Sequence, residues 1–218
     1  MPSYSQSRRL SRGASKNLSR PLSSPNKEYE PASFSNTYSA DFDGTNDYAD
    51  TGLQPDFIHT DATVSCCVKM GDFTGSQIMG THNSKRFYFG FNGTKGVMGI
   101  QNAHNLSSGV QLSSILSVGQ WHHIAVVADG GTASFYLDGV AKNTLSYTPS
   151  ASTNPTGNVY IGAREHGGNA SLPVNGSVDE FAIWNTALDA DAVAAVYNSG
   201  IPMDLSTDSG NYDNSSAL

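Results

Sequence analysis

Adjacent carboxylates on a predicted strand are the residues of this chain that come closest to a catalytic pattern. Glycoside hydrolysis needs two acids that flank the bond at a set separation. The segment Ser177 to Phe181 offers Asp179 and Glu180 side by side. Successive side chains of a strand point to opposite faces, so we expect these two acids to face opposite ways. The pattern therefore indicates no glycosidase pair, although acids gathered from different strands would leave no linear motif.

Nucleophilic and zinc chemistry lack a signature as well. No Gly-x-Ser-x-Gly elbow occurs, and the vicinal Cys66 and Cys67 have no activating pattern around them. His122 and His123 are adjacent, so they should face opposite sides of a strand, without zinc-ligand spacing to the cysteines. We expect ordinary packing or surface roles for the two histidines, and we expect both cysteines to pack in the core as small hydrophobic groups. The sequence predicts a protein that is not an enzyme.

Polar loops could contact a sugar at one rim of the fold. Asn and His side chains occur in three predicted loops, and side chains of this kind on loops serve either as ligand contacts or as solvated turns. Both interpretations stay open. The candidate ligand-binding residues are His82, Asn83, His104, Asn105, His166 and Asn169.

The first 36 residues form a basic segment rich in Ser, Arg and Pro. Six of the 12 Lys and Arg lie among the first 27 residues and no acid precedes Glu28, which leaves six basic against 19 acidic residues in the remainder. Residues 1–27 therefore carry +6 and the rest of the chain −13, within a net charge of −7. Such asymmetry predicts an extended arm that docks on an acidic surface. The proposed assembly residues are Arg8, Arg9, Arg12, Lys16 and Arg20.

The body of the chain reads as an all-β domain. From Tyr38 onward, short apolar runs recur every eight to twelve residues between Gly, Asn, Asp and Ser, which is typical of a sandwich or barrel. Asp138-Gly139 predicts a type I′ hairpin turn. Asp189 should cap one short helix, and Gly200 should supply the left-handed residue just past its end. We expect an arm at 1–36, one domain at 37–201 and a polar tail at 202–218.

Two local patterns address localisation. The chain has no apolar run of eighteen residues and no apolar stretch of a secretory signal at its N-terminus. These patterns predict neither a transmembrane segment nor a signal peptide. We therefore expect the protein to be made in a cytoplasm. An acidic body also argues against specific nucleic-acid binding.

Four stretches carry a resemblance to a known family. They are SADFDGTNDYAD at 39–50, TVSCCVKM at 63–70, WHHIAVVADGGTASFYLDG at 121–139 and YIGAREHGGNASLPVNGSVDEFAIWNTALDADAVAAVYNSG at 160–200. Together they resemble the laminin-G-like, concanavalin A-like lectin and glucanase domains. The resemblance implies an antiparallel jelly-roll sandwich with one short C-terminal helix. The E-x-D-x-E motif of the glucanases in that superfamily is absent.

The same resemblance implies a structural calcium ion. Members of the family often hold one between the first loop and the late strand, and calcium prefers carboxylate and carbonyl oxygens. The corresponding candidates are Asp43, Gly44, Asp47 and Asp179. The alternative is that Asp43 and Gly44 only make a tight turn and Asp179 accepts bonds from backbone amides.

Three functions remain as hypotheses. The first is a non-catalytic virion protein, a capsid decoration or a tail-fibre adhesin, because the chain is similar to laminin-G-like proteins of phages; its partners would be other virion subunits or copies of itself, and surface polysaccharide. The second is a freestanding carbohydrate-binding lectin. The third, a glycan hydrolase, lacks the expected motif.

Overall fold

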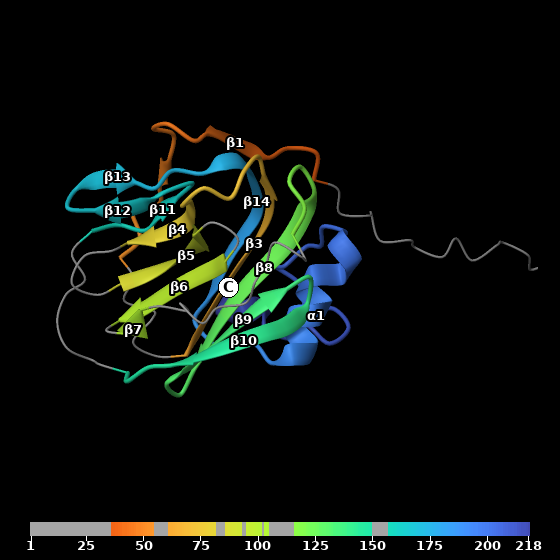
Figure 1. Ribbon diagram of the computed structural model, residues 1–218. Helices are drawn as coiled ribbons and strands as arrows, with labels where there is room; N and C mark the ends of the chain where they lie inside the picture. Colours follow the sequence, from red (N-terminus) through yellow and green to blue (C-terminus); the bar gives the residue numbers. More distant parts are fainter. Residues whose placement is uncertain are drawn as a thin grey trace, which may run out of the picture. The chain divides into compact units, whose positions relative to one another are not determined.

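A computed structural model describes residues 36–54, 61–81, 86–92, 95–101, 103–104, 116–149 and 157–218. Phe34–Leu218 form one compact unit. Within the described residues, two β-sheets face each other and enclose an apolar core (Figure 1). The expected antiparallel sandwich with one short helix is confirmed.

The first sheet has six strands, all paired antiparallel. Their spatial order is β1 (Ala40–Asp43), β14 (Asn175–Trp184), β3 (Ala62–Met70), β8 (Trp121–Asp129), β9 (Thr132–Leu137) and β10 (Val140–Ser146).

The second sheet has eight strands, antiparallel except for one parallel bridge between two short strands. Its main path is β13 (Asn169–Ser171), β12 (Arg164–His166), β4 (Gln77–Thr81), β5 (Arg86–Asn92), β6 (Lys95–Gln101) and β7 (Ala103–His104), with β11 (Tyr160–Ile161) and β2 (Ala49–Asp50) beside it. The short strands β7, β12 and β13 were not predicted from the sequence, because two or three residues are too few to show an alternating pattern.

Alternation along β3 divides its side chains between two faces. Val64, Cys66 and Val68 point into the core between the sheets. Ser65 and Cys67, being the intervening residues, point to the outer face of the six-stranded sheet. The same alternation on β8 and β14 gives the six-stranded sheet a second, outward surface.

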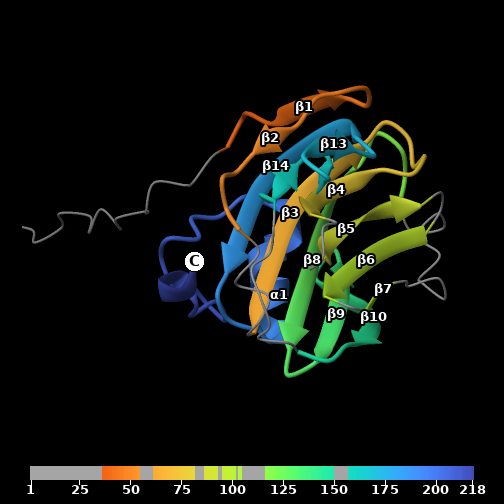
Figure 2. The ribbon, with the colours of Figure 1, turned by 90° about the vertical axis from the view of Figure 1, so that its left-hand side faces the viewer.

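Helix α1 (Ala190–Tyr197) covers part of that outer surface (Figure 1). Figure 2 shows β3, β8 and β9 side by side with the helix behind them. Asp189 caps the helix as expected, since its carboxylate accepts a hydrogen bond from the backbone N–H of Ala192 at 2.7 Å. The helix ends earlier than predicted, because Asn198 adopts the left-handed conformation (φ 43°) two residues before Gly200. Asn is the residue that replaces glycine most readily in this conformation.

The C-terminal residues pack on the same outer surface. Tyr212 is fully buried, and its hydroxyl accepts a hydrogen bond from the indole N–H of Trp184 at 3.0 Å and donates one to the carbonyl of Leu205 at 2.8 Å. This part of the chain also contains two short 3₁₀ helices, Asn198–Gly200 and Ser215–Ala217. Among the described residues, no helix is long and apolar enough to cross a membrane.

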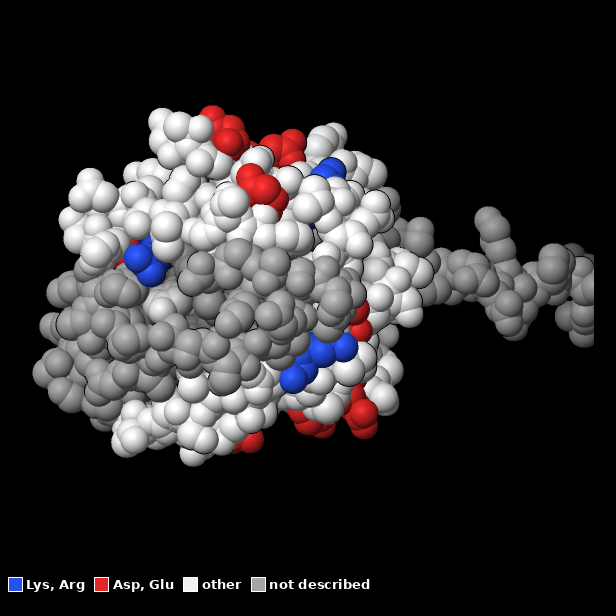
Figure 3. Space-filling model, in the orientation of Figure 1, with Lys and Arg blue, Asp and Glu red and all other residues white. Residues whose placement is uncertain are grey.

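Charge is dispersed over the described surface. On the face drawn in Figure 3, Lys and Arg side chains stand in separate places and Asp and Glu lie mainly toward its margins. The described part of this face therefore carries no basic stripe of the kind that nucleic-acid binding needs.

Candidate functional site

A cleft of about 610 Å³ lies on the outer face of the six-stranded sheet. Its floor is formed by side chains of β3, β8 and β14, and one wall by residues 36–39. The residues that follow α1 complete the rim. The cleft is therefore built where the helix stops covering the sheet.

Strand register places three polar side chains in one row on this floor. Asp179 of β14 lies opposite Cys67 of β3, and Cys67 lies opposite His123 of β8. Neighbouring strands are about 4.8 Å apart, so the three residues line the cleft as direct neighbours.

A β-bulge brings a second carboxylate to the same face. Between the pairs Asp179–Cys67 and Ala182–Ser65, β14 contains one residue more than β3, and Glu180 has a positive φ of 50°. The extra residue interrupts the alternation, so Asp179 and Glu180 both line the cleft. The expectation that they face opposite ways is wrong, because it assumed a regular strand. Asn36 bridges the two acids: its Nδ2 donates to Asp179 Oδ1 at 2.8 Å and to Glu180 Oε1 at 2.7 Å.

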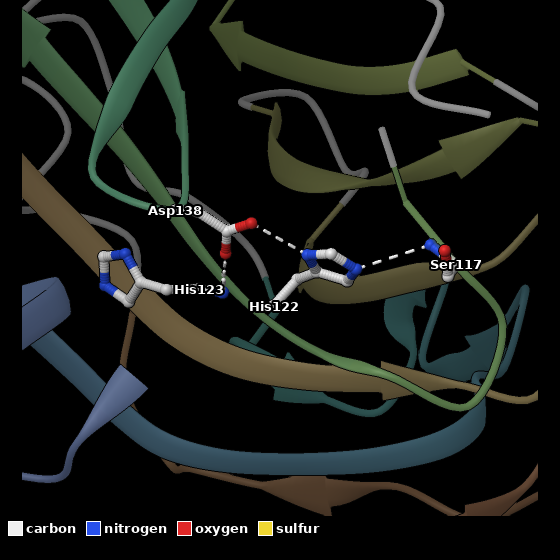
Figure 4. A network of polar contacts seen from close by, with 4 residues as sticks. All are labelled: Ser117, His122, His123 and Asp138. Atoms are coloured by element: carbon white, nitrogen blue, oxygen red, sulfur yellow. Dashed lines mark hydrogen bonds and ion pairs between the residues drawn. The ribbon is translucent and has the colours of Figure 1, made fainter. Parts of the chain in front are cut away.

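A third carboxylate comes from the turn between β9 and β10. Asp138 and Gly139 have φ angles of 49° and 73°, as expected for the predicted hairpin turn. Asp138 Oδ1 accepts from the backbone N–H of His123, and Oδ2 contacts His122 Nδ1, each at 2.9 Å (Figure 4). His122 Nε2 accepts from the backbone N–H of Ser117 at 3.4 Å, an arrangement that leaves Nδ1–H to donate to Asp138.

His123 is the buried polar group of the cleft. Its ring lies on the other side of the Asp138 carboxylate from His122 (Figure 4), as their adjacency predicted. The residue is only 4% exposed, and neither ring nitrogen has a hydrogen-bond partner among the described residues. Burial lowers the pKa of His123 to about 4, against a smaller opposing effect of Asp138. The ring is therefore neutral near pH 7 and offers one donor and one acceptor.

The two cysteines occupy different environments. Cys66 belongs to the core, as predicted, whereas Cys67 lines the cleft. Burial, and then the carboxylates of Glu180, Asp179 and Asp138, raise the pKa of the Cys67 thiol to about 12. A thiol of this kind is protonated at neutral pH and is a poor nucleophile.

Aromatic side chains stand at the mouth of the cleft. Trp121 is 44% exposed and Tyr38 is 84% exposed. The ammonium group of Lys69 lies 5.2 Å from the centroid of the Trp121 ring. Trp121, Lys69, Asp138 and Asn36 were not predicted as site residues. The W-H-H and L-D-G segments contain two of them, but there they indicated only a strand and a turn.

The residues expected to hold calcium do not come together as one set. Asp43 pairs with Asn175 in the β1–β14 register, four residues from Asp179 and therefore about 13 Å along the strand. Asp43 Oδ1 accepts from the N–H of Thr45 at 2.7 Å, and Asp47 Oδ2 accepts from the N–H of Asp43 at 3.1 Å. Gly44 has a φ of 77°, as a tight turn requires. The four residues thus do not fit a single ion, and the described residues contain no cluster of three His, Cys, Asp or Glu suited to a metal.

The expected sugar-contact residues lie away from the cleft or outside the described residues. His166 and Asn169 pair across the β12–β13 hairpin, where Asn169 Nδ2 donates to the carbonyl of Gly167 at 3.1 Å. His104 is described only as part of the backbone of β7. The remaining predicted residues lie outside the described ranges: His82, Asn83, Asn105 and, in the arm, Arg8, Arg9, Arg12, Lys16 and Arg20.

Comparison with protein families agrees with this architecture. The model of the Laminin_G_3 family, the concanavalin A-like lectin/glucanases superfamily, matches residues 43–194. The chain belongs to this family. No curated protein gives a significant match.

Solved structures share the fold at low identity. The CBM40 of the Ruminococcus gnavus IT-sialidase is 14% identical, with a TM-score of 0.57 over 73% of this chain and 98% of that one. The same module bound to α2,3 sialyllactose is 15% identical, with a TM-score of 0.56 and the same coverage. The NanB sialidase of Streptococcus pneumoniae is 18% identical, with a TM-score of 0.55 over 72% of this chain and 27% of that one. At these identities, the similarity of this Laminin_G_3 domain to the three solved structures shows a shared fold and nothing more.

Proposed function

We propose that this protein is a non-catalytic carbohydrate-binding module whose glycan ligand lies in the outer-face cleft. The observation that carries the proposal is the pairing of the exposed Trp121 ring with free polar atoms at the floor of the same cleft. A sugar ring presents C–H groups on its faces and hydroxyl groups around its edge, so it needs an apolar plane beside hydrogen-bonding partners. Ligand pockets combine apolar walls with a few placed polar groups in this way.

Membership of a superfamily that contains lectins supports this proposal. The α2,3 sialyllactose held by the CBM40 of the R. gnavus enzyme is a precedent for glycan binding on a related sandwich. That precedent concerns the fold and not the position of the ligand.

The arrangement of Asp179 and Glu180 supports binding without catalysis. A glycosidase places its two carboxyl groups about 5 to 9.5 Å apart on either side of the scissile bond. Here Asp179 and Glu180 are sequence neighbours joined by one amide nitrogen of Asn36. The Cys67 thiol is protonated at neutral pH because of its raised pKa. The pair of Asp179 and Glu180 therefore lacks the separation of a glycosidase pair, and Cys67 is not an activated nucleophile.

Replacement of Trp121 tests the proposal. The Trp121→Ala variant should bind a glycan identified on an array at least about fivefold more weakly, because a stacking plane contributes roughly 1 kcal/mol or more. Tyr48→Ala is the matched control, since Tyr48 is 45% exposed but does not line the cleft. Isothermal titration calorimetry measures both. Equal affinities of the two variants, or no glycan bound by the wild type, would overturn the proposal.

Attachment to a virion through the basic arm is a second candidate function. The observation that favours it is the opposite charge of the first 27 residues (+6) and the remainder (−13), which suits docking of the arm on neighbouring subunits by charge and coupled folding. Replacing the five assembly residues by Ser should prevent incorporation into a large particle but leave the melting temperature of the domain unchanged. Light scattering of the native particle measures the first effect. Incorporation of the substituted chain would refute this role, and a freestanding lectin would be the remaining reading.

Calcium binding remains a prediction, and its proposed site is now the turn that contains Asp43 and Asp47. An ion bound there raises the melting temperature in calcium, because a ligand of the native state stabilises it. Asp43→Asn should remove that rise and Asp179→Asn should keep it. A rise that is absent from the wild type refutes the calcium prediction.

A further inference from the structure

We infer that the outer-face cleft selects a cationic amino sugar, a glycan unit with a free ammonium group, over neutral and anionic sugars. The inference rests on the proposed function and names the ligand class of the same site. Three observations support it: the charge of the cleft, the oxygens that remain free on two of its carboxylates, and a buried histidine without a partner.

The cleft carries three carboxylates and one ammonium group. Asp138, Asp179 and Glu180 line it together with Lys69. The Lys69 ammonium lies over the Trp121 ring and makes no ion pair with a carboxylate of the described residues. The His123 ring adds no charge, because burial lowers its pKa to about 4, and the carboxylates of the cleft outnumber its ammonium group by two.

Two carboxylate oxygens remain free for a ligand. Asp179 Oδ1 accepts from Asn36 Nδ2 and from the backbone N–H of Glu180, and Glu180 Oε1 accepts from Asn36 Nδ2. Asp179 Oδ2 and Glu180 Oε2 accept no hydrogen bond from the described residues. Asn36 also shows that one nitrogen reaches both carboxylates at once. An ammonium group has three N–H donors, so it can bond the free oxygens by charge-assisted hydrogen bonds, which are about twice as strong as neutral ones.

His123 provides the independent sign that the cleft takes a polar ligand. The residue is nine-tenths buried or more, lines the cleft and has no partner for either ring nitrogen among the described residues. A buried polar group without a partner is destabilising. The neutral ring can bond a sugar hydroxyl without repelling an ammonium group. The row Asp179, Cys67, His123 on adjacent strands places this partner beside the acids.

An anionic sugar would be repelled by the carboxylates of the cleft. A ligand carboxylate in this cleft would approach three like charges with only Lys69 to oppose them. Like charges in a partly desolvated site are mutually destabilising. A neutral N-acetylated sugar keeps its hydroxyl contacts and its stacking on Trp121, but loses the charge-assisted bonds.

Calorimetric titration of the full-length chain with three matched probes tests the inference. The probes are the glucosamine trisaccharide, its fully N-acetylated counterpart and α2,3 sialyllactose, at about pH 6, where a primary amine is protonated. The deacetylated trisaccharide should bind about tenfold more tightly than the acetylated one, and sialyllactose should bind most weakly. The double variant Asp179→Asn with Glu180→Gln should remove the tenfold preference and keep the affinity for the acetylated sugar. Asp208→Asn with Asp213→Asn is the control, because it removes the same two charges outside the cleft.

The outcomes separate this inference from the proposed function. Equal binding of both trisaccharides, sensitive to Trp121→Ala, overturns the amino-sugar inference and leaves a carbohydrate-binding module. No binding of any sugar overturns both. A synthetic peptide of residues 1–27 that binds in competition with the amino sugar and more tightly identifies the cleft as a site for basic peptides and refutes the inference. The comparison of wild-type affinities also decides the matter where the double variant does not fold.

Discussion

Acidification should destabilise the protein through His123, whose buried ring has no partner to stabilise its charged form. The pKa of His123 is about 4 in the folded chain, against an ordinary value of 6.5. Between these two values the unfolded chain binds more protons than the folded one, so stability falls as pH falls. The contribution of this group is complete above about pH 6.5 and is lost progressively down to about pH 4.

The magnitude follows from the difference between the two pKa values. At about 1.4 kcal/mol per pKa unit, the full loss is about 3 kcal/mol, and about 2 kcal/mol of it is reached at pH 5. Most surface carboxylates have pKa values near 4 and remain ionised at pH 5. The histidine therefore dominates the change between pH 7 and pH 5.

Urea unfolding at these two pH values measures the effect. His123→Gln keeps a polar side chain but does not titrate, so this variant should lose about 2 kcal/mol less than the wild type between pH 7 and pH 5. His166→Gln is the control, because His166 is exposed at a hairpin. The quantity compared is the change in each protein's free energy of unfolding between pH 7 and pH 5. A variant that is less stable at both pH values is therefore still informative. The same pH-dependent loss in His123→Gln and wild type would refute the argument.

Three further predictions concern side chains on the outer face of the six-stranded sheet and the turn beside it. Tyr212→Phe leaves the buried indole N–H of Trp184 without its acceptor, and urea unfolding should show a loss of about 1 to 3 kcal/mol; an unchanged midpoint would contradict the burial. The thiol of Cys67 has a pKa of about 12 against an ordinary 9. It should therefore react with iodoacetamide about 1,000-fold more slowly in the native than in the urea-unfolded chain. Equal rates in the two states would place the thiol outside the cleft floor. Gly139→Ala should lower the free energy of unfolding by about 1 kcal/mol more than Gly119→Ala does, as measured by thermal unfolding. Both glycines have a positive φ, but only at Gly139 would the new Cβ lie 2.9 Å from an aromatic carbon of α1. Equal losses of stability in the two variants would show that backbone strain alone is responsible.

The sequence predicted the parts of the fold that depend on local patterns. Alternating apolar residues marked the long strands, Asp138-Gly139 marked its hairpin, and Asp189 marked the start of the helix. The end of the helix was wrong by two residues, because Asn198 took the left-handed conformation usually reserved for glycine. The packing of Tyr212 on Trp184 had no local signal, since it joins an isolated aromatic residue of a polar segment to a strand.

The candidate site was harder to predict because it depends on strand order and on one irregularity. Asp179, Cys67 and His123 become neighbours only through the order β14, β3, β8, which no short motif encodes. A regular β14 would have turned Glu180 away from Asp179, and the bulge reverses that orientation. This reversal changes the chemistry more than the fold: it converts two acids on opposite faces into a pair that shares one nitrogen donor. The ligand preference of the cleft therefore depends on a single inserted residue in one strand, and removal of Glu180 should restore regular pairing there, with one carboxylate facing the cleft in place of two.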